Sequence, residues 1–519
     1  MLNLIPVLLL LLAALAMLVV HLFRPDFIYH WLIALAGALL AWPILLVGGL
    51  NLPVSIPLVF WQPEALFNTS PALLVDRLSW PYAVALATLV LAVILTDVVR
   101  AAEADWITWS GELALVALGI LAVLSGNPLT LLLGWTVIDL GELLVMLSQV
   151  PSSTIRERVI ISVAVRVLGS GLLLTAVLVA RLNGADLTFS AIPPQASPFL
   201  ILAAGLRLGV VPLHLPFLRD PQLRRGLGTL ARFTPAAASL VLLARTANVG
   251  ETLTFQPLLL GLVAAAALFG GAAWVLATDE LEGRQAWILG GASLAVAAAV
   301  RGQPTASLAW GMAVLLSGGV LFLTSIRERR LIWITMLGVL GITALPFSPT
   351  WNGARLYDPP FNVLLIFFLI TQILLVLGFI RHTLSGVERL VGLERWVWLI
   401  YPLGLGLLPV SLLLFGWWTN PGIADAPAAG WWIGAVVTVA SALAIAGFRL
   451  RSVQFPNELP LYNSLLSFGW LYQVFRGFYR LLSRLIAFLS NVLEGEGGLL
   501  WALLILLMLL SVVWRSGGG

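Results

Sequence analysis

The sequence predicts an all-α polytopic membrane protein with about 16 transmembrane helices. Of its 519 residues, 60% are hydrophobic and only 10% are charged, whereas soluble domains are about half apolar and about a quarter charged. The mean hydropathy is +1.02. Apolar runs of the roughly 20 residues that cross a bilayer recur along the whole chain.

Sixteen apolar windows give the expected helices in order. They are residues 4–22, 28–50, 79–100, 111–125, 127–149, 159–181, 198–218, 227–247, 256–278, 284–301, 305–325, 330–347, 360–381, 395–417, 430–449 and 498–514. Only the turn-forming stretch Ser125-Gly126-Asn127-Pro128 separates the fourth window from the fifth. Between the second and third windows, residues 51–77 combine several prolines with short apolar strings. This composition predicts an outer loop with extended or hairpin structure.

The arginines predict the orientation in the membrane. All 28 basic residues are arginine, and the chain has no lysine. Nineteen of them fall on one side of the predicted spans, six fall on the other, and three lie within spans. Because positive charge concentrates in cytoplasmic loops, the richer side is expected to be cytoplasmic. Both termini are then expected on the outer side of the cell (plasma) membrane, and the net charge of +4 does not indicate nucleic-acid binding.

The absence of two residue types limits the chemistry of the chain. It contains no cysteine, which excludes disulfides, thiolate metal sites and cysteine-bound iron–sulfur clusters. It also has no glycine-rich nucleotide-binding motif, so the chain itself is not expected to oxidise NADH, and no cofactor is expected. Buried lysine can be made to titrate near neutral pH, but arginine effectively cannot. A chain without lysine therefore lacks one common proton-carrying group.

Residues 461–495 predict an amphipathic helix that does not cross the membrane. Arg476, Arg480 and Arg484 recur at every fourth residue among apolar side chains, so they share one helix face. Such a helix is expected to lie along the cytoplasmic surface before the last span returns across the bilayer. Two roles fit it: an anchor on the membrane surface, or a brace against a neighbouring subunit.

One predicted span is interrupted in an unusual way. In "AAGLRLGVVPLHLPFLRD", residues 203–220, Arg207 stands inside apolar sequence and His214 lies between Pro212 and Pro216. Proline removes a backbone donor and breaks a helix, so this span is expected to be broken near its middle. Arg207 would then be a fixed cation within the membrane.

A second interrupted segment follows five spans later. In "LGVLGITALPFSPTWNG", residues 337–353, Pro346 and Pro349 break an apolar run. An offset of five spans reverses the orientation, so the two segments are candidates for inverted counterparts. Paired interruptions of this kind point to a midplane site in transporters. The simpler alternative is that proline is more frequent in membrane helices than in soluble ones.

Five stretches in chain order resemble a known family. They are "LLVDRLSWPYAVAL" (73–86), "NPLTLLLGWTVIDLGELL" (127–144), "GLRLGVVPLHLPFLRD" (205–220), "AAAALFGGAAWVLATDELEGRQAW" (264–287) and "GITALPFSPTWNG" (341–353). With sixteen spans and a lateral helix before the last one, they are similar to the antiporter-like, proton-translocating membrane subunits of respiratory complex I (NADH-quinone oxidoreductase). Multisubunit cation/proton antiporters and membrane-bound hydrogenases share this family.

The resemblance implies two inverted five-helix repeats, each with a broken helix. These would occupy residues 111–247 and 256–381, after N-terminal helices and an outer loop in 1–110 and before C-terminal helices in 395–519. It also implies proton or cation translocation through half-channels joined by buried Glu and Lys residues. In this family, the subunit works inside a larger complex whose redox chemistry takes place in partner subunits.

The chain departs from the family at the positions that carry protons. Thr136 follows Trp135 where the family has Glu, and Arg207 stands where the family has its buried Lys. Arg232 falls on a histidine position of the eighth helix, and residues 307–323 contain no ionisable side chain. The family pattern Thr-Asp-x-Lys-Arg becomes Thr-Asp-Glu-Leu-Glu at 278–282.

Charged residues nevertheless remain within the predicted spans. Asp139 and Glu142 lie one and two turns past Thr136 on roughly one helix face, and intramembrane carboxylates usually face a partner or a water-filled cavity. Arg207 is their expected partner, with Arg166 as a further structural partner. A carboxylate beside a buried arginine stays ionised, which favours a permanent brace.

Two alternatives to this brace remain open. One is a residual proton or ion path through Asp139, Glu142 and His214. The other concerns Arg232 alone, which could be a helix-end residue that reaches toward the cytoplasmic surface.

The sequence therefore predicts a membrane subunit of a complex I-like or multisubunit antiporter-like assembly. Its partners would be other membrane subunits and the lipid bilayer, with no nucleic acid. The alternative is a transport-inactive structural subunit that scaffolds a larger membrane complex. A polytopic membrane enzyme is a third class, but the 51–77 loop offers only Glu64 and Asp76 as acidic groups.

Overall fold

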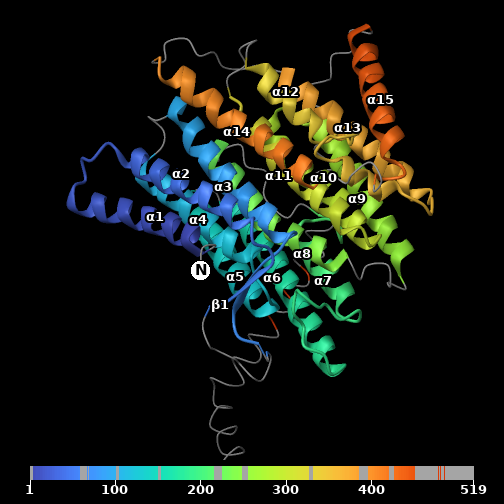
Figure 1. The fold of residues 1–519 in the computed structure, drawn as a ribbon, viewed down its shortest axis with the longest axis horizontal. Coiled ribbons are helices and arrows are strands. Elements are labelled where there is room, and N and C mark those ends of the chain that lie inside the picture. The colour runs from blue at the N-terminus through green and yellow to red at the C-terminus, as the bar shows by residue number, and fades with distance from the viewer. Residues whose placement is uncertain are drawn as a thin grey trace, which may run out of the picture. The chain divides into compact units, whose positions relative to one another are not determined.

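The computed structural model consists of helices and one small hairpin (Figure 1). It describes residues 4–58, 67, 69–100, 105–149, 153–214, 225–247, 255–325, 331–384, 395–419 and 426–450, together with 477, 480 and 484. The helices are α1 (Ile5–Phe23), α2 (His30–Gly48), α3 (Ser79–Thr96), α4 (Trp106–Val123), α5 (Pro128–Gln149), α6 (Ser153–Leu182), α7 (Ser197–Arg207), α8 (Arg225–Thr246), α9 (Gln256–Leu276), α10 (Glu280–Val300), α11 (Pro304–Leu323), α12 (Ile332–Leu340), α13 (Leu364–Leu384), α14 (Val397–Trp418) and α15 (Gly430–Leu450).

These helices confirm the predicted all-α polytopic architecture. Among the described residues, eleven helices are long and apolar enough to cross a membrane, so the chain is a multi-pass membrane protein. The first fifteen predicted windows correspond in order to α1 through α15. The sixteenth window, 498–514, lies outside the described residues. So does the predicted lateral helix at 461–495, apart from residue 477 and the exposed, helical Arg480 and Arg484.

Three helices form the centre of the described bundle. Every residue of α3 is buried, as is every residue of α8 from Gly226 and of α11 from Ala306, and the three helices pack against one another. In Figure 1, α1 and α2 lie on one side of this centre and α9, α13 and α15 on the other. Small residues permit the close packing: a Cβ at Gly311 of α11 would stand 1.9 Å from the Tyr82 hydroxyl oxygen of α3.

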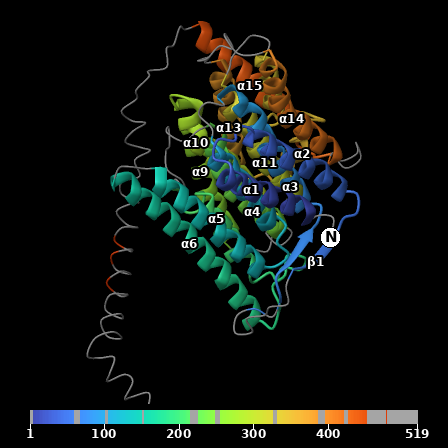
Figure 2. The ribbon, with the colours of Figure 1, turned by 90° about the vertical axis from the view of Figure 1, so that its left-hand side faces the viewer.

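The loop between α2 and α3 forms the expected hairpin. Strands β1 (Val54–Pro57) and β2 (Ala72–Val75) pair in antiparallel register, with Val54 opposite Val75. The β2 strand is also attached to the turn between α4 and α5, because the Leu74 amide donates to the Leu124 carbonyl at 2.7 Å. Both views place β1 and the start of α1 at the same end of the helices (Figures 1 and 2).

The interruption in the first segment begins earlier than the prolines predict. Helix α7 ends at Arg207, and Gly209 follows with a φ of 78°. The Val210 amide donates to the Gly205 carbonyl at 2.8 Å, and the Gly209 amide donates to the Leu206 carbonyl at 3.1 Å. This is a Schellman helix end, which needs glycine in the left-handed region. The span 198–218 is therefore interrupted near its middle, as expected, but the interruption begins at Arg207–Gly209 and not at the prolines. Pro212 follows this end as an exposed residue, and Pro216 lies outside the described residues.

The second segment is interrupted as well. Helix α12 has only nine residues, and the backbone beyond it turns through Ala344 and Phe347, which have φ values of 53° and 65°. Pro346 and Pro349 lie in this turn, before the 3₁₀ helix Trp351–Tyr357. The short helices α7 and α12 are each the fourth helix within 111–247 and 256–381. That these two ranges are inverted repeats stays a prediction.

Candidate functional site

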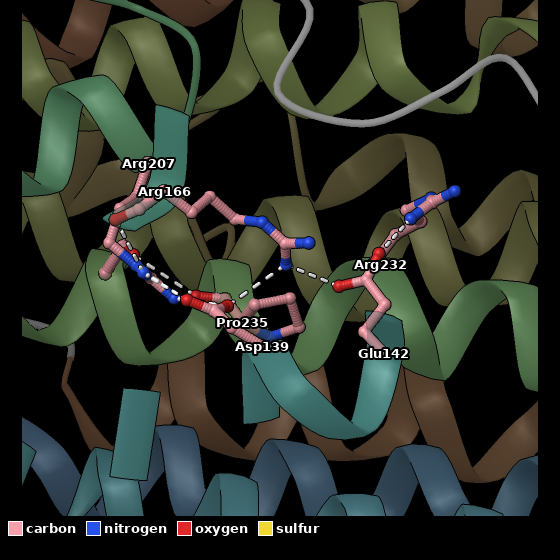
Figure 3. Close-up of polar contacts among 7 residues, drawn as sticks. Asp139, Glu142, Arg166, Arg207, Arg232 and Pro235 are labelled. Carbon is pink, nitrogen blue, oxygen red and sulfur yellow. Dashed lines mark hydrogen bonds and ion pairs between the residues drawn. The ribbon is translucent and has the colours of Figure 1, made fainter. Parts of the chain in front are cut away.

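Five charged side chains from four helices meet in the interior. We call this group the charge cluster: Asp139 and Glu142 from α5, Arg166 from α6, Arg207 from α7 and Arg232 from α8 (Figure 3). Each of them is at most 5% exposed. Charged groups buried to this degree require partners, and the cluster supplies them internally.

Local sequence sets the position of the two carboxylates. Helix α5 begins at Pro128, and the Asn127 side chain caps it by accepting the Thr130 amide at 3.0 Å. Asn at this position satisfies one of the unpaired amides of a helix start. Asp139 and Glu142 are three residues apart on α5 and therefore project from the same face, which is turned toward α6, α7 and α8 (Figure 3).

Arg207 binds Asp139 through two parallel contacts. Arg207 Nη1 donates to Oδ2 at 2.7 Å, and Nη2 donates to Oδ1 at 2.8 Å. Nη1 also donates to the Arg166 carbonyl at 3.1 Å. The guanidinium lies 4.2 Å from the ring centroid of Trp135, a cation–π arrangement. Two-point binding fixes the orientation of both groups and belongs to the stronger class of charge-assisted hydrogen bonds.

Arg166 joins the two carboxylates. Its Nη1 lies 2.5 Å from Glu142 Oε2 and 3.2 Å from Asp139 Oδ1. The other oxygen of Glu142 accepts from Nη1 of Arg232. Each carboxylate is thus shared between two arginines, and the ion pairs form one continuous network across α5, α6, α7 and α8.

The arginines outnumber the carboxylates in the cluster. Three guanidinium groups face two carboxylates, so one formal positive charge remains within it. The space lined by Glu142, Ser162, Arg166 and Arg232 has no room for a water molecule, which would need about 10–15 Å³. Proton exchange needs groups that change protonation state, and a guanidinium keeps its proton.

The structure brings together five of the six predicted charge-site residues. Arg232 is 3% exposed and points into the cluster, so it does not extend to a surface as the alternative interpretation held. His214 is the sixth. It is buried, and its Nδ1 lies 2.7 Å from the Pro212 carbonyl oxygen within its own turn. The functional roles of all six residues stay predictions.

Sequence reasoning missed other buried charges because it counted arginines near the ends of predicted spans as membrane-surface charges. Arg245, at the end of α8, is 4% exposed. It donates to the Ser125 and Leu74 carbonyls at 2.5 and 2.9 Å, and its Nη2 lies 3.2 Å from an oxygen of Asp76. These contacts tie the hairpin to the bundle. Nothing in the sequence links positions so far apart along the chain.

A second missed contact involves Arg225 and Glu280. Their side chains pair at 2.6 Å between the first residues of α8 and α10. Arg284, the first residue of its predicted span, lies within α10 and is 4% exposed. Helices α8 and α10 begin before the windows 227–247 and 284–301, which left Arg225 and Glu280 outside the predicted spans.

Comparisons with known proteins identify the fold. No family model and no curated protein sequence match the chain. A chain of the membrane-bound sulfane sulfur reductase, an archaeal respiratory membrane complex, superposes with a TM-score of 0.68 and 14% identity, covering 97% of this chain and 99% of the other. A chain of the Mrp complex from Dietzia sp. DQ12-45-1b gives a TM-score of 0.69 at 14% identity, covering 99% of this chain and 63% of the other.

Respiratory complex I from Thermus thermophilus also contains a similar chain. In the NADH-bound structure the TM-score is 0.62 at 18% identity, covering 85% of this chain and 99% of the other. At identities this low the similarity concerns the fold and not the activity. The chain therefore has the polytopic fold found in subunits of these three membrane complexes.

Proposed function

We propose that the chain is a membrane subunit of a complex I-like or antiporter-like assembly, and that its charge cluster is a permanent brace. Two lines of support converge. The fold occurs in chains of three multisubunit membrane complexes, and five stretches in chain order resemble the antiporter-like subunits. The chain would lie in the plasma membrane with both termini outside and with other membrane subunits as partners.

The two-point contact between Arg207 and Asp139 carries the brace proposal. A relay group must release its proton and take up another, but arginine is effectively always protonated. The small space beside Glu142, Arg166 and Arg232 has no room for a water molecule, which also favours a structural role. Taking one charge from such a buried pair is costly, on the order of 3–5 kcal/mol. The cluster would therefore hold α5, α6, α7 and α8 together and leave ion movement to other subunits.

Ion translocation by this chain is the second candidate, and the two interrupted helices favour it. At the second interruption, the Tyr357 hydroxyl donates to Gln372 Oε1 at 2.9 Å, and Gln372 Nε2 donates to the Ile342 carbonyl at 3.1 Å. Polar groups beside a broken helix are what a midplane site requires. Under this candidate, Asp139, Glu142 and His214 would carry the protons or cations, driven by a partner redox module.

One experiment separates the two candidates. The tagged chain is purified from its native membrane with its partners, and the assembly is reconstituted in liposomes that contain a pH-sensitive dye. Asp139→Asn is compared with the wild type and with Arg24→Gln, a change at an exposed arginine outside the cluster. A brace predicts less assembled complex and an unchanged proton flux for each complex that does assemble.

Translocation predicts the opposite pattern. Asp139→Asn would then assemble at wild-type levels and lose its flux. Recovery of the wild-type chain alone, without other membrane subunits, would contradict the subunit assignment under either candidate.

A further inference from the structure

A cavity and a groove meet at the start of α3, and no residue of the charge cluster lines either of them. The cavity has a volume of about 510 Å³, and Arg77 and Thr305 lie among its lining residues. The groove has a volume of about 530 Å³ and is lined by residues of α2, α3 and α14. Trp80, Phe415 and Trp418 line both, so the two spaces adjoin. Each volume is in the range of small-molecule sites, about 300–1,000 Å³.

The groove presents a mostly apolar surface, and polar side chains in its wall are already bonded within the protein. The Trp42 indole donates to the Thr88 hydroxyl at 2.8 Å, and the Trp80 indole donates to the Leu45 carbonyl at 2.7 Å. The Ser411 hydroxyl lies 3.4 Å from that of Thr88. An occupant therefore meets indole rings and aliphatic carbon, and it is not required to supply hydrogen bonds.

The cavity differs from the groove because it contains a cation. Arg77 precedes α3 and is exposed. Its neighbour Asp76 is engaged by Arg245, so this carboxylate does not neutralise it. At the same end, Trp417 and Trp418 of α14 are 80% and 62% exposed. Exposed tryptophans mark the level of the lipid headgroups in membrane proteins. The cation and the groove thus lie where a phospholipid has its phosphate and the start of its acyl chains.

We propose that this site binds one phospholipid with an anionic headgroup. Its phosphate would lie at Arg77 and one acyl chain would fill the tryptophan-lined groove. A helix of a partner subunit fits the groove less well than an acyl chain, since ten residues of helix occupy roughly 1,000 Å³ and the groove has about 530 Å³. A free phosphate would use Arg77 but leave the groove empty. The proposal stands independently of the function proposed above.

Native mass spectrometry of the purified, delipidated protein tests the site. The protein is titrated with phosphatidylglycerol and, separately, with phosphatidylcholine of the same chain length. Arg77→Gln is expected to weaken the tightest phosphatidylglycerol binding by about fivefold, which equals about 1 kcal/mol for one arginine near an anionic lipid. Arg24→Gln, at another exposed arginine, is expected to change nothing.

The groove is tested separately by filling it. Leu414 lines the groove and Leu413 does not, although both are exposed residues of α14, at 49% and 40%. Leu414→Trp is expected to weaken binding of both lipids by blocking the acyl chain, while Leu413→Trp leaves it at the wild-type level. These variants change surface residues, so a folding defect does not obscure the result.

Three results would overturn the proposal. The first is equal affinity for phosphatidylglycerol in Arg77→Gln and Arg24→Gln. The second is equal binding in Leu414→Trp and Leu413→Trp. The third is displacement of the bound lipid by millimolar inorganic phosphate, which would assign the cavity to a free anion.

Discussion

Arg207 and Asp139 lie 68 positions apart in the sequence and bind each other through two contacts of 2.7 and 2.8 Å. Arg207 is the last residue of α7. A cation at a helix C-terminus interacts favourably with the unpaired carbonyls there, so the same guanidinium stabilises the end of α7 and its attachment to α5. The ion pair therefore attaches α7 to α5 at the residue where the membrane helix is interrupted.

Arg207→Gln is expected to destabilise the protein strongly. It leaves Asp139 with only the longer contact to Arg166 at 3.2 Å, and an uncompensated buried charge costs about 3–5 kcal/mol. The unfolding temperature in detergent, followed by tryptophan fluorescence, should fall by several degrees. Arg207→Lys keeps the charge but not the two-point geometry, so a smaller fall is expected. Equal unfolding temperatures for Arg207→Gln and the wild type would contradict the brace.

The pair should also show strong energetic coupling. In a double-mutant cycle, Asp139→Asn and Arg207→Gln each leave an unpaired partner, whereas the double variant leaves none. The double variant should therefore lose less free energy of unfolding than the two single changes together, by about 1–3 kcal/mol. A cycle of Asp139→Asn with Arg24→Gln should be additive. Additivity in both cycles would show that the contact has little energetic value.

The sequence indicated the charge cluster because charge is rare within its spans. Asp139 and Glu142 are spaced to share one face of α5, and Arg166, Arg207 and Arg232 are the three arginines that lie away from the ends of the predicted helices. Since charges inside a bilayer need partners, few pairings were available. The network itself, with each carboxylate shared by two arginines, depends on the packing of four helices and has no signature in local sequence.

The ends of the helices were predicted less accurately than their order along the chain. Prolines suggested that the first interruption lies at 212 and 216, but Gly209 ends α7 earlier by adopting a positive φ. Conversely, α10 begins at Glu280, before its apolar window, because polar side chains at a helix start are satisfied by neighbours such as Arg225. Hydropathy indicates which part of a helix is apolar, but it does not locate the residues at which the helix begins and ends.

Arg245→Gln is expected to loosen the hairpin. Arg245 donates to the Leu74 and Ser125 carbonyls and pairs with Asp76, so its loss removes a donor from the buried Ser125 carbonyl at about 1–3 kcal/mol. Hydrogen–deuterium exchange should become faster in peptides covering 72–76 and 124–127, with little change in α11. Arg77→Gln, beside the hairpin but exposed, is the matched control. Unchanged exchange in both peptides would rule out this anchoring role.

The predicted orientation can be tested cleanly because the chain has no cysteine. Asn183→Cys and Asp26→Cys each introduce one thiol at an exposed position, on opposite sides of the predicted topology. A membrane-impermeant maleimide applied to intact cells should label residue 183 and spare residue 26, with both labelled after permeabilisation. The reverse pattern would invert the assignment based on the distribution of arginines.

Two glycines on α6 provide a test of how closely α6 and α7 pack. A Cβ at Gly169 would lie 2.7 Å from Cγ of Arg207 and 3.2 Å from the Ala203 carbonyl oxygen, whereas a Cβ at Gly171 would meet nothing within 4 Å. Gly169→Ala is therefore expected to displace the Arg207 side chain and cost about 1–3 kcal/mol, as overpacking does. Gly171→Ala should be neutral or stabilising by about 0.5–1 kcal/mol, because alanine favours helix over glycine. Equal shifts of the unfolding temperature in both variants would contradict this expectation. The position of the Arg207 side chain would then not depend on Gly169, and the close approach of α6 to α7 would not be needed to stabilise the ion pair.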